Sequence, residues 1–150
     1  MLLPDVNVLV YAHRQDSPDH DRYRNWLEGV LNGDEPFGIA ELVLSGFLRI
    51  VTHPRVFRAP TPLDVAFAFV QQIRTHSSCV IVQPGPRHWA IFDQLCRATN
   101  ATGNLIPDAY LAALAIESAN DWITTDRGFA RFPGLRWWHP LSPIGEPREK

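Results

Sequence analysis

Short apolar runs alternate with longer segments of helical periodicity along this chain, and the alternation limits the folds open to it. The runs at 2–5, 36–40, 79–82, 122–125 and 135–138 have the length and content of strands. No two-residue hairpin signal joins any two of them, so neighbouring strands are expected to pair in parallel through crossover helices. The chain is therefore predicted to be α/β, a three-layer α/β/α sandwich with a mostly parallel central sheet.

Helices are predicted between these strands. Ser17-Pro18-Asp19 and Thr61-Pro62-Leu63-Asp64 are typical helix starts, because a hydroxyl can cap the first turn and proline suits the first helical position. After a first helix that begins at Asp5, the predicted helices span 17–33, 41–52, 61–76, 87–98 and 107–119.

Length and composition indicate one globular domain. A chain of 150 residues that is 45% hydrophobic and 20% charged can bury a core sufficient to offset the entropy of folding. We assign residues 1–140 to this domain. The polar, proline-rich segment 141–150 is expected to fray.

Charge and cysteine usage bear on compartment and partners. The net charge of −2 provides no basic field, so any contact with nucleic acid depends on local patches. Lys150 is the only lysine among 14 basic residues; the arginines suit phosphate contacts but can equally reflect codon bias.

Cys79 and Cys96 lack metal or disulfide spacing and are predicted to be buried thiols. With no signal segment and no run of ~20 apolar residues, a cytoplasmic protein without membrane contact is expected.

Four acidic residues fall at equivalent places in this pattern. Asp5 and Asp126 end predicted strands, and two more acids, Glu41 and Asp108, begin predicted helices. The ligand site of an open parallel sheet lies outside the carboxyl ends of its strands. The four carboxylates are therefore expected to meet in one pocket although they are far apart in the sequence.

Clustered carboxylates need a counter-ion. Like charges within a few ångströms repel and favour protonation unless a cation neutralises them. Oxygen ligands favour Mg²⁺ or Mn²⁺, while the six histidines show no zinc spacing and none is assigned a catalytic role. Such an ion near a phosphate lowers the pKa of an attacking water, which indicates phosphodiester hydrolysis.

Four segments in order are similar to the signatures of PIN-domain ribonuclease toxins of the VapC family. They are Pro4-Asp5-Val6-Asn7, Glu41-Leu42, Asn104-Leu105-Ile106-Pro107-Asp108-Ala109 and Thr124-Thr125-Asp126-Arg127-Gly128-Phe129. The resemblance implies a Mg²⁺-dependent endoribonuclease toxin of a type II toxin–antitoxin module, with RNA as substrate, a cognate antitoxin and a homodimeric state. It implies that Asp5, Glu41, Asp108 and Asp126 are catalytic and metal-binding, with Asn7 and Thr124 as supporting polar residues.

Alternatives remain open from the residues alone. Glu41 has only generic apolar neighbours, so Asp34, Glu35 or Asp93 could take its place. Asp5 could merely cap a helix, and the domain could bind RNA or protein without cutting. A Mg²⁺-dependent phosphatase or phosphoacceptor would need a lysine near the phosphate, which the terminal Lys150 does not supply.

The expected dimer has a candidate surface. Six apolar residues of two predicted helices exceed what one small core needs, and they are Leu42, Leu44, Phe47, Leu48, Phe67 and Phe69.

Overall fold

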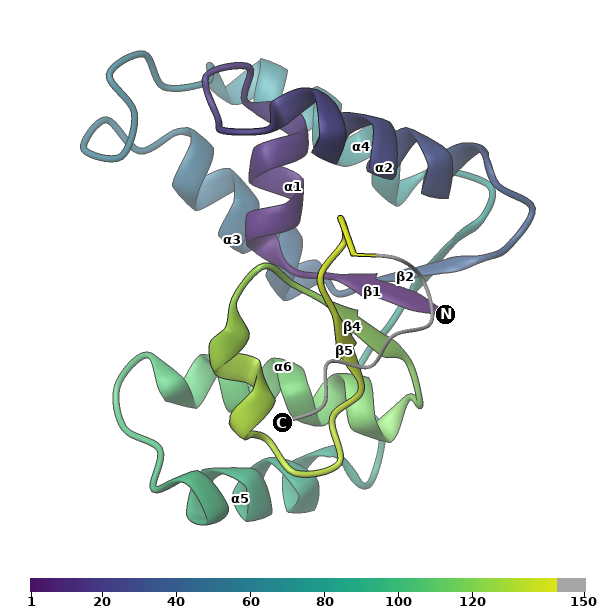
Figure 1. Ribbon diagram of the computed structural model, residues 1–150, viewed down its shortest axis with the longest axis vertical. Coiled ribbons are helices and arrows are strands. Elements are labelled where there is room, and N and C mark those ends of the chain that lie inside the picture. The colour runs from purple at the N-terminus through teal and green to yellow at the C-terminus, as the bar shows by residue number, and fades with distance from the viewer. Residues whose placement is uncertain (143–150) are drawn as a thin grey trace.

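The computed structural model of the chain describes residues 1–142 and contains alternating short strands and helices (Figure 1). The strands are β1 (Leu2–Pro4), β2 (Phe37–Ile39), β3 (Cys79–Ile81), β4 (Asp121–Ile123) and β5 (Trp137–Trp138). The helices are α1 (Val6–His13), α2 (His20–Asn32), α3 (Glu41–Val51), α4 (Leu63–Arg74), α5 (His88–Thr99), α6 (Leu105–Glu117) and the 3-10 helix η1 (Arg127–Arg131).

The strands form the middle layer of a three-layer arrangement. β4 pairs in parallel with both β1 and β5, and β2 pairs in parallel with β3. Helices α1 to α4 lie on one side of the strands and α5 and α6 on the other (Figure 1). The predicted α/β/α sandwich with parallel strands is confirmed.

The middle layer consists of two sheets, β1-β4-β5 and β2-β3, which lie side by side. β2 lies next to β1 without a hydrogen-bonded ladder between them. A Cβ atom on Gly38 would come within 2.9 Å of Val82 Cγ2 and 3.2 Å of Leu3 Cδ1, so a larger residue there would push the strands apart. Glycine at this position keeps β2 packed between its neighbours.

The core lies between the helical layers and the strands. Trp122, Phe37, Phe47 and Phe129 are its largest fully buried side chains. In α6, alanines such as Ala109, Ala112, Ala113 and Ala115 are completely buried, and their small side chains let this helix approach the strands closely. α6 therefore packs closely against β4, and this packing sets the position of the first turn of α6.

Several local expectations are corrected by the structure. α2 begins at His20 instead of at Ser17, because Asp19 takes a left-handed conformation with φ 55° and no side chain caps the helix. Thr61 does not cap α4; it is buried, and its Oγ1 lies 3.1 Å from His13 Nε2 and 3.2 Å from Arg14 Nη1. α6 begins at Leu105, two residues before the predicted Pro107.

Burial of the two cysteines differs from expectation, because Cys79 and Cys96 are free but only half-buried. β3, which begins at Cys79, lies at the outer end of the row of strands, and Val80 is 42% exposed. His88 is buried, with Nε2 2.9 Å from the carbonyl oxygen of Tyr110.

The predicted dimer surface is divided between core and exterior. Leu44 and Phe47 are buried in the chain's own core, whereas Leu42 and Phe67 are 50% and 43% exposed. Dimerisation therefore stays a prediction. No helix within residues 1–142 has the length and apolar content to cross a membrane. The expected fraying from 141 onward falls almost entirely on residues 143–150, outside the described part.

Candidate active site

Parallel pairing of β1 with β4 places Asp5 beside Thr124. Pro4 lies opposite Ile123 in the register, so the next residue of each strand leaves the sheet at the same level. The Thr124 hydroxyl donates to Asp5 Oδ2 at 2.7 Å, and both side chains are buried. Asp5 also caps α1, because its Oδ1 accepts from the backbone N–H of Val6 at 2.7 Å.

Asn7 joins this pair and completes a small polar network. Its Nδ2 donates to Asp5 Oδ2 at 3.2 Å and to Thr124 Oγ1 at 3.3 Å. Its Oδ1 accepts from the backbone N–H of Thr125 at 3.3 Å. The structure thus places Asn7 and Thr124 around the Asp5 carboxylate, where they fix its orientation.

Asp126 follows β4 by three residues and caps a helix that the sequence did not predict. Its Oδ1 accepts from the backbone N–H of Gly128 at 2.8 Å, at the start of η1. Its own backbone N–H donates to Thr124 Oγ1 at 3.0 Å. Thr124 therefore links the Asp5 carboxylate to the segment that carries Asp126.

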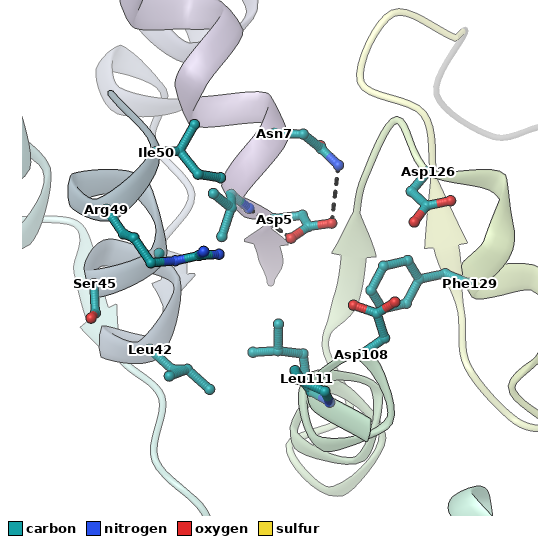
Figure 2. A pocket seen from close by; sticks show the side chains of 13 residues that line it. Asp5, Asn7, Leu42, Ser45, Arg49, Ile50, Asp108, Leu111, Asp126 and Phe129 are labelled. Carbon is teal, nitrogen blue, oxygen red and sulfur yellow. Dashed lines mark hydrogen bonds between the residues drawn. The ribbon is translucent and has the colours of Figure 1, made fainter. Parts of the chain in front are cut away.

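Asp108 reaches the same pocket from the opposite layer, in the first turn of α6. Figure 2 shows Asp5, Asp108 and Asp126 directed into one hollow, which is about 380 Å³ in volume. Asp5 lies buried, Asp108 half-buried and Asp126 exposed. Three of the four predicted acids thus converge, each from a different element.

The carboxylates affect one another's ionisation. Burial raises the pKa of Asp5 to about 6, opposed by the hydrogen bonds from Thr124 and Val6 and reinforced by the charges of Asp108 and Asp126. Burial and the charge of Asp126 raise the pKa of Asp108, while Arg131 lowers it. Without a cation, Asp5 and Asp108 therefore bind protons more tightly than aspartates in water do.

Glu41 is not brought to the other acids. It is the first residue of α3, and its Oε2 accepts from Arg74 Nε and Nη2 at 3.1 and 3.0 Å on an exposed surface. It does not line the pocket. Its side chain extends toward the end of α4 instead, so the place of Glu41 in the acidic set stays a prediction. Of its suggested substitutes, Asp93 pairs with Arg97, and Asp34 and Glu35 do not line this pocket.

This geometry predicts that Glu41→Gln leaves most activity intact. An exposed ion pair contributes ~0–1 kcal/mol, so kcat/KM should stay within about fivefold of wild type. The Mg²⁺-dependent RNA cleavage that the sequence resemblance implies is the activity to measure, with Arg74→Gln as the matched variant that removes the same ion pair from its other side. If Glu41→Gln alone loses as much activity as an Asp108 variant does, Glu41 acts in the site.

Two further polar residues that sequence reasoning did not single out line the pocket. Ser45 and Arg49 lie one and two turns beyond Glu41 on α3. The spacing of Leu42, Ser45 and Arg49 marks one helical face, which is a signal the sequence contains. Which face turns toward the aspartates depends on how α3 packs against α1.

Comparison with known families identifies the domain. The PIN domain family model matches residues 2–135. The chain belongs to the PIN-domain family. The matched PIN region includes Asp5, Asp108 and Asp126.

Individual PIN-domain relatives agree with this assignment. The chain is 50% identical to ribonuclease VapC43 of Mycobacterium tuberculosis over 142 residues, which cover 95% of this chain and 97% of the relative. It therefore falls in the VapC group of the family. The PIN fold is shared with VapBC2 from Rickettsia felis bound to a promoter DNA fragment, at TM-score 0.68 and 19% identity, covering 91% of this chain and 96% of that one. A toxin–antitoxin complex from Klebsiella pneumoniae has TM-score 0.58 and 18% identity, covering 95% and 100%.

Proposed function

We propose that the chain is an endoribonuclease toxin that hydrolyses RNA phosphodiester bonds with the help of a divalent cation, Mg²⁺ or Mn²⁺. The observation that carries the proposal is the convergence of Asp5, Asp108 and Asp126 in one pocket. Substantial identity to a ribonuclease, over nearly the full length of both chains, supports RNA as the substrate.

The residues of the pocket fit a hard divalent ion. All candidate ligands are oxygens, and the pKa of Asp5, which burial raises, would fall when a cation binds beside its carboxylate. Within residues 1–142, no three acidic, histidine or cysteine side chains stand close enough to ligate one ion together. Mg²⁺ commonly keeps several waters and takes only one or two protein carboxylates directly, so this separation is compatible with it.

The chain's own residues have distinct tasks in this proposal. Asp5, held by Thr124 and Asn7, provides a fixed carboxylate oxygen at the floor of the pocket. Asp108 and Asp126 flank its more open part, where they can orient a water and accept its proton. When bound, the cation would polarise the phosphate and lower the pKa of the attacking water.

Removal of divalent metal is the direct test. Purified protein freed of metal with EDTA should not cut single-stranded RNA, and Mg²⁺ or Mn²⁺ should restore cleavage. Binding to the folded state should also raise the free energy of unfolding by about 2.7 kcal/mol at a metal concentration of 100 times Kd. Cleavage that persists in EDTA would contradict the metal dependence, whereas RNA binding without cleavage at any metal concentration would favour a non-catalytic domain.

The proposal extends to a protein partner. A solved protein of the same fold is part of a toxin–antitoxin complex, which supports a cognate antitoxin for this chain. We propose that such a partner silences the enzyme by inserting an arginine among Asp5, Asp108 and Asp126. A guanidinium makes bidentate, charge-assisted hydrogen bonds with carboxylates and would compete with the metal.

Competition between arginine and metal predicts weaker metal binding in the complex. Calorimetric titration should show Mn²⁺ affinity reduced by roughly tenfold or more, since close charge pairs at interfaces couple by at least about 1.5 kcal/mol. Equal affinity in the free and the bound protein would show that the partner only covers the RNA path.

A further inference from the structure

One wall of the pocket is basic where the other walls are acidic. The pocket-lining residues of α3 follow helical spacing and are Leu42, Ser45, Gly46, Arg49 and Ile50. Arg49 is the only charged residue among them. In Figure 2 its guanidinium extends from α3 into the hollow, toward Asp5 and across from Asp108 and Asp126.

Arg49 is free to take a ligand. Its side chain is exposed and makes no hydrogen bond or ion pair with any residue in 1–142. Seven of the eleven other arginines within residues 1–142 are engaged: Arg14, Arg24, Arg74, Arg97 and Arg136 form ion pairs, and Arg87 and Arg131 donate to the carbonyls of Glu117 and Gly128. Within residues 1–142, the Asp5 carboxylate accepts hydrogen bonds from Val6, Asn7 and Thr124 and forms no ion pair with Arg49.

Tight packing of α3 against α1 sets the place of Arg49. A Cβ atom on Gly46 would come within 2.9 Å of Val6 Cγ2, so α3 lies as close to the start of α1 as glycine permits. Asp5 is the residue immediately before Val6. The Arg49 guanidinium and the Asp5 carboxylate therefore lie on facing walls of one pocket, and the helices α3 and α1 that hold them pack directly against each other.

An RNA phosphate needs such an arrangement. The aspartates attract a cation but repel the phosphodiester anion, which carries its charge on two non-bridging oxygens. A guanidinium presents N–H donors in a planar fork that matches these oxygens. We propose that Arg49 binds the non-bridging oxygens of the scissile phosphate and holds it between the α3 wall and the three aspartates. This inference rests on the proposed ribonuclease function.

Cleavage kinetics of Arg49 variants with a short single-stranded RNA test it at saturating Mn²⁺. Arg49→Ala should lower kcat/KM by roughly 100-fold, as loss of one preorganised donor to the reacting group does. Arg49→Lys should recover part of the loss, because it keeps the charge but not the fork. Mn²⁺ affinity measured by calorimetry should not fall in Arg49→Ala, since the arginine does not ligate the metal. Arg22→Ala, at an exposed arginine of α2 outside the pocket, is the matched control.

The outcomes separate this inference from the function it rests on. Wild-type protein that cuts RNA while Arg49→Ala cuts within twofold of Arg22→Ala would overturn the role of Arg49 alone. An increase in kcat/KM in Arg49→Ala would also overturn it, because the residue would then obstruct the site. If wild-type protein cuts no RNA, fluorescence anisotropy with the same RNA decides: weaker binding in Arg49→Ala than in Arg22→Ala supports the phosphate contact, and equal binding refutes it. Thermal melting of each variant confirms that it is folded.

Discussion

Replacing Asp5, Asp108 or Asp126 with asparagine should each reduce RNA cleavage by roughly 100-fold or more, without unfolding the domain. In the proposed mechanism, each change removes a negative charge that helps to hold the divalent ion and to orient the attacking water. It also relieves repulsion within the pocket, so the metal-free variants should melt at or above the wild-type temperature. Initial rates at saturating Mg²⁺, together with thermal melting in EDTA, measure both effects.

Asp93→Asn is the matched control for these three variants. Asp93 is an exposed acid on α5 that pairs with Arg97 one turn away, outside the pocket. Its loss should leave the cleavage rate near that of wild type. Full activity in any one of the three pocket variants would remove that residue from the site, and a drop in melting temperature would mean that its role is in folding.

The second large effect expected is a change in the free energy of unfolding with pH, caused by the titration of Asp5. Its pKa is about 6 in the folded protein against 3.8 as the reference value. Between these values the folded state keeps a proton that the unfolded state has released, so the contribution of Asp5 to stability falls as pH rises from about 4 to about 6. At neutral pH, the raised pKa of Asp5 lowers the free energy of unfolding by roughly 3 kcal/mol relative to acidic pH.

Comparison of wild type with Asp5→Asn isolates this contribution. The raised pKa of Asp108 acts in the same direction as that of Asp5, while the lowered pKa values of Asp16 and Glu117 act in the opposite direction at the acid end, below their reference values of 3.8 and 4.5, so the wild-type curve alone is not diagnostic. In metal-free urea unfolding, the variant should match wild type below pH 4 and become more stable by up to about 3 kcal/mol at pH 7. Mg²⁺ at about 1,000 times Kd should reverse the difference, because about 4.1 kcal/mol of binding free energy then stabilises only the wild type. A difference between the two proteins that does not change with pH would refute the account.

Much of the fold could be predicted from local sequence patterns. Short apolar runs separated by helical segments require parallel strands, since each strand returns to the sheet only through a crossover helix. That requirement also placed Asp5 at the end of β1 and Asp108 in the first turn of α6, on the same rim. Helix boundaries were less accurate, as at Asp19, because a left-handed residue and a buried Thr61 replaced the expected caps.

The sequence by itself determined the strands and the α-helices, though not η1, and that Asp5, Asp108 and Asp126 lie at or beside their ends, because these properties depend on periodicity and on the direction of parallel strands. Only the tertiary structure decided which face of α3 borders the pocket. The rotation of a helix about its axis depends on contacts distant in sequence, here Gly46 against Val6. That contact turns Arg49 toward the aspartates and leaves Glu41 to pair with Arg74 outside.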